Sequence, residues 1–346
     1  MKKLIIVIFL LIVTATPVCA SDMEAPEAPD SAQEYIQGNT ESFADGLWYI
    51  FKQAVAHFQP SLAEAAHIAV TSIAVILLSA ILRGFSGSSK QVVDLVATLC
   101  IASALVSSTN SMIHLGIATV EELSEYGKLL LPIMTAALAA QGGITASTSL
   151  YAGTAIFNTV LTVAIAKIIV PMVYIYMVLC IGYSAIGEDL LKTLRDFIKW
   201  LITWSIKITL YIFTGYLSIT GVISGTTDAA TLKATKLAMS GAVPVVGNII
   251  SDASETVLVS AGIVKNSAGI YGLLAIIAIW VGPFVKIGVQ YLLLKLVSAI
   301  CTTIGSKTTV GLINDFASIM GLLVAMTGTV CLLLFVSTVC YLKGGS

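Results

Sequence analysis

The residues of this sequence that could do chemistry inside a membrane are ionisable side chains within long apolar runs. Each costs about 3 kcal/mol at the centre of a bilayer, so it needs a partner or water. Lys286 and Gln290 are four residues apart and share one face of a helix. Two interpretations are open: buried pairing or snorkelling at helix ends, and a path for a substrate or ion. Pairing is favoured, since an ion-coupled transporter is expected to gather more such residues at mid-depth. The polar residues in these runs are Asp94, Lys167, Lys286, Gln290, Lys295 and Asp315.

A second group of candidates combines glycine, proline and carboxylates in one short stretch. Glycine and proline at these spacings interrupt a helix. Backbone left without partners at membrane depth is tolerated only against protein or water. The stretch therefore predicts a re-entrant or interhelical element that lines a conduit or contacts another subunit. Its candidate residues are Ser240, Gly241, Pro244, Gly247, Asp252 and Glu255.

Enzyme chemistry finds no support in the motifs. His57, His67 and His114 are far apart in the sequence and lack the spacing of metal ligands. Five of the six cysteines lie in apolar runs, where a free cysteine packs as a small hydrophobe. The run Gly305–Thr308 resembles the end of a phosphate-binding loop, but its lysine does not follow the glycine and the upstream glycine is missing. We expect no catalytic residue, cofactor or metal.

The composition identifies the solvent. Of 346 residues, 57% are hydrophobic and 11% charged, against about 25% charged in soluble domains. Mean hydropathy is +0.97. The composition predicts an all-α polytopic protein surrounded by membrane lipid. The net charge of −1 argues against nucleic acid, which requires a clustered basic surface.

About seven transmembrane helices, within a range of six to eight, fit the apolar segments. The third is too long for one straight span, and Pro171 predicts a kinked helix or two closely joined helices. The short apolar run Leu129–Ala140 is equally consistent with a re-entrant or broken helix and with a spanning one. The predicted spans are 65–82, 92–112, 151–186, 205–224, 268–284, 288–304 and 319–341.

Between the third and fourth spans, Glu188–Trp204 has the pattern of an amphipathic helix. Leucine, isoleucine and phenylalanine recur at helical spacing, with Lys192, Arg195, Asp196 and Lys199 on the opposite face. Such a helix is expected in the headgroup region of the cytoplasmic leaflet.

The sequence predicts that the chain has three parts. Residues 1–20 have the lysines, apolar run and small-residue site of a signal peptide. Residues 21–60 form a short acidic extracytoplasmic leader, and 61–346 the helical transmembrane domain. With the leader outside, seven crossings would place Lys343 inside together with Arg83 and Lys90.

The C-terminal half of the chain closely resembles the stage III sporulation protein AE family of endospore-forming bacteria. The resemblance rests on SGAVPVVGNIISDASETVLVSAGIVK from Ser240 to Lys265, on Gly282-Pro283-Phe284, and on QYLLLKL from Gln290 to Leu296. It extends over most of the chain through the layout of the signal peptide, spans and basic amphipathic helix, is strongest from about residue 235 onward, and includes no match for the acidic leader. It implies a membrane component of the channel complex that joins mother cell and forespore, in the mother-cell membrane around the forespore. It also implies three partners: an ATPase, ring-forming subunits and a forespore counterpart.

We therefore expect a non-enzymatic multispanning subunit of a sporulation-specific secretion or feeding channel, required for late forespore development. The alternative is a stand-alone secondary transporter or ion channel. Small residues in the last spans favour close helix contacts, within one chain or in a homo-oligomer.

Overall fold

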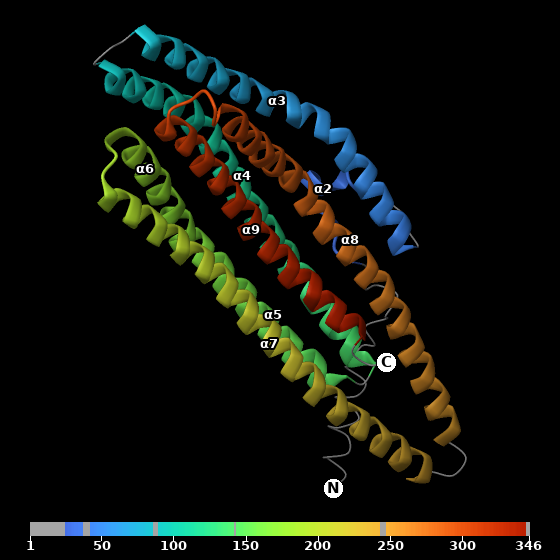
Figure 1. Ribbon diagram of the computed structural model, residues 1–346. Coiled ribbons are helices and arrows are strands. Elements are labelled where there is room, and N and C mark those ends of the chain that lie inside the picture. Colours follow the sequence, from blue (N-terminus) through green and yellow to red (C-terminus); the bar gives the residue numbers. More distant parts are fainter. Residues whose placement is uncertain (1–24, 37–41, 86–88, 142, 243–246, 344–346) are drawn as a thin grey trace.

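The computed structural model describes residues 25–36, 42–85, 89–141, 143–242 and 247–343 (Figure 1). Within them, the backbone alone is described for 218–266 and Lys343. The predicted signal peptide lies outside the described residues.

Long antiparallel helices form the molecule, and the described residues contain no strand. Figure 1 shows them running up and down along one axis as an elongated bundle. The all-α prediction is therefore confirmed. The elements are α2 (Asp30–Gln33), α3 (Phe43–Phe85), α4 (Lys90–Ala140), α5 (Ile144–Ala164), the π-helix η3 (Ile165–Ile169), α6 (Val170–Ile186), α7 (Asp189–Ala242), α8 (Gly247–Cys301) and α9 (Lys307–Lys343).

Six helical segments of the described chain are long and apolar enough to cross a membrane. They confirm a multispanning protein within the predicted range. The predicted spans 268–284 and 288–304 are one helix, α8, which continues through Pro283. A proline interior to a membrane helix is tolerated because neighbouring groups satisfy the freed carbonyl. The segments are Phe43–Phe85, Lys90–Ala140, Ile144–Ile186, Asp189–Leu217, Ser267–Cys301 and Lys307–Leu342.

These helices are longer than a bilayer requires. At 1.5 Å per residue, the 51 residues of α4 extend about 77 Å, whereas the hydrocarbon core is roughly 30 Å thick. Part of each long helix therefore lies beyond the hydrocarbon while remaining helical.

The run Leu129–Ala140 is not a separate re-entrant element. It forms the last turns of α4, which continue through Pro132 and end at Gln141. Leu130, Leu131 and Met134 are buried in the core of the bundle. Because these side chains pack in the core, the segment continues the helix α4. The sequence alone did not show this packing.

The long third segment contains the interruption that Pro171 predicts. Five residues, Ile165–Ile169, form a π-helix between α5 and α6, and Pro171 stands in the first turn of α6. Proline has no N–H to donate to the carbonyl four residues earlier. The helix therefore widens locally to a π-helix and then continues as α6.

The amphipathic segment Glu188–Trp204 is not a separate interfacial helix. From Asp189 onward it is the beginning of α7, which continues without a break to Ala242. A tight turn precedes it, with Gly187 at φ +81°, a conformation that glycine adopts at low cost. The backbone N–H of Gly187 donates to the carbonyl of Tyr183 at 2.8 Å. Arg195 and Lys199 of its polar face turn towards α9, whereas Lys192 and Asp196 are exposed.

The even number of spans changes the predicted topology. Since the spans predicted at 268–284 and 288–304 fall in the single helix α8, α3 begins and α9 ends at the same end of the bundle (Figure 1). Seven crossings would have placed Lys343 at the end opposite the leader. The structure instead gathers Arg83 and Lys90 at the other end, with the α6–α7 and α8–α9 turns.

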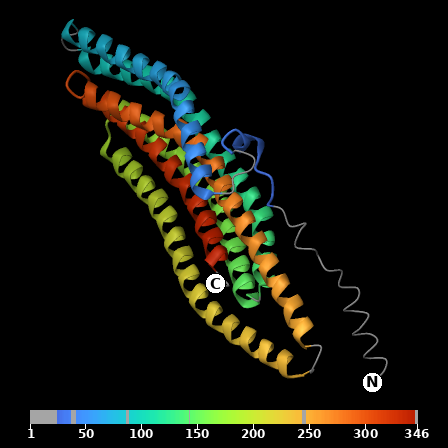
Figure 2. The same ribbon diagram turned by 90° about the vertical axis from the view of Figure 1, so that its right-hand side faces the viewer.

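The described part of the acidic leader packs on the bundle. Ala28, Ala32 and Tyr35 are buried, and α2 contacts α8 (Figure 2). Burial, and to a smaller extent the neighbouring Glu34 carboxylate, raises the pKa of the Tyr35 hydroxyl. Residues from Phe43 onward already belong to α3, so this end of the leader is helical.

Helix α9 is central in the bundle. Of the 18 most apolar consecutive residues of α9, 61% are buried, compared with 17% for the equivalent stretch of α7. Glycines let α4 approach it closely: a Cβ built on Gly127 would lie 2.7 Å from Leu334, and one on Gly116 would lie 3.3 Å from Met326. A polar side chain in the middle of α9, such as Thr327, is therefore surrounded by protein.

Candidate functional site

A buried ion pair joins α7 to the central helix α9. Nη1 of Arg195 donates to Oδ2 of Asp315 at 2.8 Å, and Nη2 of Arg195 donates to Oδ1 of Asp196 at the same distance. The side chains of Arg195 and Asp315 are 14% and 10% exposed. The guanidinium also lies 4.7 Å from the centre of the Tyr183 ring. Each buried charge thus has a partner of opposite sign, which offsets the large desolvation free energy of an isolated charge.

Two further cations contact the same side of α9. Nζ of Lys199 donates to Oγ of Ser318 at 3.1 Å. Nζ of Lys295, from α8, donates to Oδ1 of Asn314 at 2.7 Å. We call Arg195, Lys199, Lys295, Asn314, Asp315 and Ser318 the α9 polar cluster.

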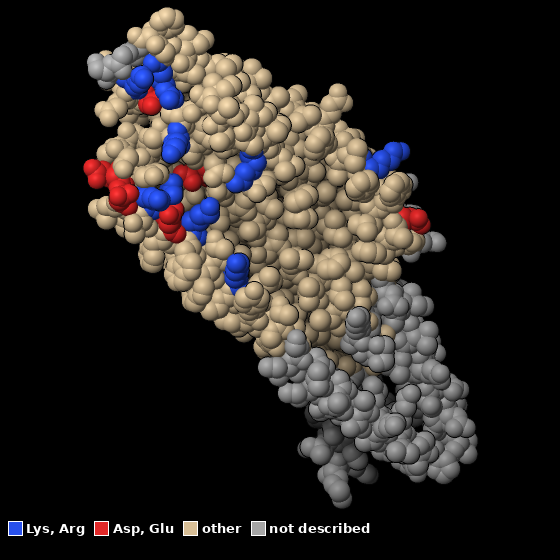
Figure 3. Space-filling model, in the orientation of Figure 1, with Lys and Arg blue, Asp and Glu red and all other residues tan. Residues whose placement is uncertain are grey.

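Helical periodicity explains how α9 presents these groups. Asn314 and Ser318 are one turn apart, and Asp315 lies beside them. Arg195 and Lys199 are likewise one turn apart on α7, which runs parallel to α9, so one turn of each helix faces the other. Figure 3 shows charged side chains gathered towards this end of the bundle on an otherwise largely uncharged face.

Asp94 lies in a second, smaller ion pair at the tip of the α3–α4 hairpin. Its Oδ1 is 3.5 Å from Nε of Arg83, and the side chains are 27% and 31% exposed. The pair joins the end of α3 to the beginning of α4, apart from the α9 polar cluster in the fold.

The remaining polar candidates do not join these groups. Gln290 is buried, and its Nε2 is 3.5 Å from Oγ of Ser108 on α4. Lys286, one turn earlier, is exposed on α8. Lys167 is exposed on η3. Neither lysine forms an ion pair with any residue that the structure describes.

The glycine–proline candidates fall at the junction of α7 and α8. Ser240 and Gly241 are in the last turn of α7, and Gly247 begins α8, which also contains Asp252 and Glu255. Pro244 and the side chains of the other five lie outside the described residues. The predicted role of this junction stays a prediction.

Arg195 is the functional candidate that sequence reasoning missed, since its helix was expected to expose the basic face. Asp315 could have indicated such a residue, because an acid inside an apolar run requires a cationic partner. The sequence alone does not show which lysine or arginine is that partner.

The leader segment makes a further set of polar contacts part-way along the bundle, where α2 lies (Figure 1). Oγ of Ser31 donates to Oε2 of Glu122 at 2.6 Å, and the Tyr126 hydroxyl donates to the Pro26 carbonyl at 3.4 Å. Oε1 of Glu34 is 3.1 Å from Nε2 of His57. These contacts connect the leader to α4 and α3.

Groups suited to metal chemistry are not assembled in the described chain. Among its residues, no three histidine, cysteine, aspartate or glutamate side chains lie together as a metal site. Of the described cysteines, Cys180, Cys301 and Cys331 are buried and form no disulfide bond.

Fold and site together define a multi-pass helical membrane protein whose best-buried charges are neutralised across helices. Its family is equally clear: the chain belongs to the stage III sporulation protein AE family, whose model matches residues 29–345. The match begins within the acidic leader, which the sequence resemblance had not included. The chain is 22% identical over 324 residues to a Bacillus subtilis (strain 168) protein named stage III sporulation protein AE, covering 91% of this chain and 80% of that protein. No solved structure matches.

Proposed function

We propose that this protein is a non-enzymatic subunit of a sporulation-specific secretion or feeding channel complex between mother cell and forespore. Family membership over residues 29–345 is the observation that carries the proposal. The name of the family places the protein in sporulation, and the six apolar helices place it in a membrane. The channel, its location in the mother-cell membrane around the forespore, and the requirement for late forespore development belong to the proposal.

The pairing of charges supports a fixed subunit over a carrier. The Arg195–Asp315 pair and the Lys295–Asn314 hydrogen bond cross between helices and hold α7 and α8 against α9. Contacts of this kind oppose movement of α7 and α8 relative to α9, because separating a buried pair leaves each charge without a partner. The α9 polar cluster is thus suited to holding a bundle together as a platform.

The partners in this proposal are an ATPase, ring-forming subunits and a forespore counterpart. The basic end of the bundle, with Arg83, Lys90 and Lys192, faces the cytoplasm in this arrangement, because positive residues concentrate there. An ATPase would meet this end. The opposite end, with the leader and the α7–α8 junction, would meet the ring-forming subunits and the forespore counterpart.

Substitutions at the junction between α7 and α8 test the proposal. Leucine at Gly241, Pro244 or Gly247 is expected to abolish spore formation and co-purification of the other subunits while the protein still reaches the membrane. A leucine at Gly215 of α7, whose Cβ position has nothing within 4 Å, is the matched control and should leave spore yield unchanged. Wild-type spore yield from all three junction variants would remove the role proposed for this segment.

One observation favours the alternative of a stand-alone transporter or channel. Lys167 is exposed on a π-helix, an irregularity frequent at functional sites. Purified protein in liposomes without partners should then move ions or a solute. Movement that disappears in Lys167→Leu would establish this alternative, whereas an inactive protein that co-purifies with partners supports the subunit.

A further inference from the structure

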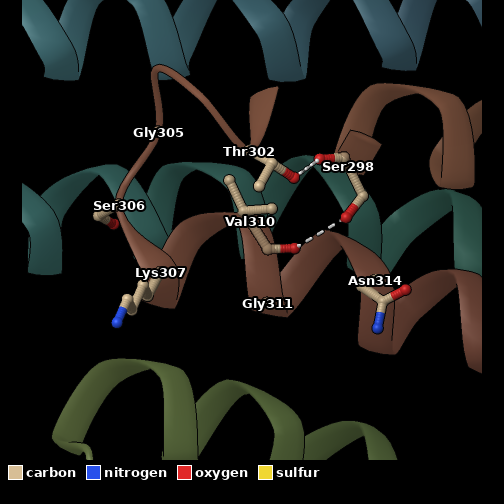
Figure 4. A pocket seen from close by; sticks show the side chains of 8 residues that line it. All are labelled: Ser298, Thr302, Gly305, Ser306, Lys307, Val310, Gly311 and Asn314. Atoms are coloured by element: carbon tan, nitrogen blue, oxygen red, sulfur yellow. Dashed lines mark hydrogen bonds between the residues drawn. The ribbon is translucent and has the colours of Figure 1, made fainter. Parts of the chain in front are cut away.

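A cavity of about 300 Å³ lies where the end of α8 meets the beginning of α9 (Figure 4). Ser298 of α8 and Thr302 of the turn after it line the cavity, together with Lys307, Gly311 and Asn314 of α9. Its volume is at the lower end of the range for small-molecule sites. The cavity adjoins the α9 polar cluster and shares Asn314 with it.

The cavity has an excess of positive charge. Lys307 lines it, and Lys295 is held at its edge by the hydrogen bond to Asn314. Neither ammonium lies within 4.0 Å of a carboxylate in the described chain, and no lining residue is acidic. The nearest acid in sequence, Asp315, already pairs with Arg195. An anion entering the cavity would therefore meet two cations without competition.

The hydrogen bonds within the wall leave specific donors for a ligand. The hydroxyls of Ser298 and Thr302 donate to the carbonyls of Val310 and Ser298, as the dashed lines of Figure 4 show. Asn314 uses Oδ1 to accept from Lys295, so its amide N–H groups remain for another acceptor. In Figure 4 the Lys307 ammonium and the Asn314 amide nitrogen point to the same side of α9.

Glycine keeps the space between these two donors open. Gly311 lies one turn after Lys307 and one turn before Asn314. A Cβ built on it would have no heavy atom within 4 Å. A large side chain at this position would therefore occupy the cavity without colliding with the rest of the protein.

The surroundings of the cavity are apolar and open to lipid. Leu292 and Leu296, on either side of Lys295 in α8, are exposed by 60% and 53%. Basic pockets between helices at the cytoplasmic side of membrane proteins are suited to anionic headgroups, because cations meet phosphate while neighbouring apolar side chains meet acyl chains. A free phosphate ion would make no use of these apolar residues.

We propose that this cavity is a binding site for an anionic phospholipid. Lys307 and the Asn314 amide donate to the headgroup phosphate, with Lys295 nearby, and an acyl chain follows Leu296 and Leu292 along α8. The site would fix the α8–α9 turn at the membrane surface, independently of the role in sporulation.

The test measures lipid retained by the full-length protein. Wild type is purified from vesicles of phosphatidylcholine mixed with phosphatidylglycerol, and native mass spectrometry counts each bound lipid. Wild type should retain phosphatidylglycerol in preference to phosphatidylcholine. Lys307→Gln should lower that retention about 5-fold, as expected for one lysine near an anionic headgroup. Gly311→Leu, which fills the cavity, should lower it at least as much.

Matched controls separate this site from general charge attraction. Lys192→Gln removes an exposed lysine of α7 that does not line the cavity, and Gly288→Leu changes another glycine with nothing within 4 Å. Both should retain the lipid as wild type does. Equal retention of the two lipids by wild type, or equal losses in Lys307→Gln and Lys192→Gln, would overturn the proposal. Displacement of phosphatidylglycerol by inorganic phosphate alone would show a free-anion site and overturn the lipid assignment.

Discussion

Two cations within membrane-spanning segments, Arg195 of α7 and Lys167 of η3, have opposite environments. Arg195 was expected on an exposed face, yet its guanidinium is buried against α9 and paired with Asp315. Lys167 lies deep in an apolar run, yet it is exposed on the outside of the bundle. The hydropathy of the surrounding sequence therefore did not indicate which charge is buried. The position of the helix relative to α9 decided it.

The largest effect is expected from removing one partner of the central pair. Arg195→Met keeps the length of the side chain but leaves Asp315 buried without a cation. The loss of stability should be about 3–5 kcal/mol. It would appear as a marked fall in the temperature at which detergent-solubilised protein aggregates.

The double variant Arg195→Met with Asp315→Leu provides the control. Replacing both partners by apolar side chains removes the uncompensated charge, so most of the stability should return. If the single and double variants were equally unstable, shape at this contact, and not charge, would account for the loss.

A smaller effect is expected from packing at the periphery, where α5 contacts α7. A Cβ on Gly153 would lie 1.9 Å from Cε1 of Tyr216, whose hydroxyl donates to the Ser149 carbonyl at 2.8 Å. Gly153→Ala should therefore displace this ring and cost about 1–3 kcal/mol. The same aggregation temperature measures it.

Gly215→Ala is the matched control for that packing change. Gly215 is next to Tyr216 on α7 and has nothing within 4 Å of its Cβ position. Alanine there should be neutral or stabilise the helix by about 1 kcal/mol. Equal destabilisation by the two substitutions would mean that close contact between α5 and α7 is not the cause.

The smallest effect is expected at Lys167. Because this side chain is exposed and has no ion pair among the described residues, Lys167→Leu should change stability by less than about 0.5 kcal/mol. Aggregation temperatures of wild type and variant should agree within error. A loss as large as that of Arg195→Met would show that Lys167 has an essential partner and would reverse the comparison between the two cations.

Sequence patterns predicted some irregular elements correctly and others incorrectly. Pro171 indicated the interruption that the structure shows as η3, because a missing N–H is a local property. Pro132 and Pro283 have the same local property, yet α4 and α8 continue through them. Packing against neighbouring helices made the difference, and a single sequence contains no record of it.

The composition and the length of the apolar runs by themselves determined a multispanning helical membrane protein, because transfer from water to hydrocarbon depends on side-chain type and not on neighbours. The residues from Ser240 to Leu296 likewise indicated the family. Only the tertiary structure decided that Arg195 pairs with Asp315, that Leu129–Ala140 is part of α4, and that the predicted spans 268–284 and 288–304 fall in one helix. Those outcomes depend on which helices lie side by side, and contacts between residues more than a hundred positions apart leave no periodic signal in the chain.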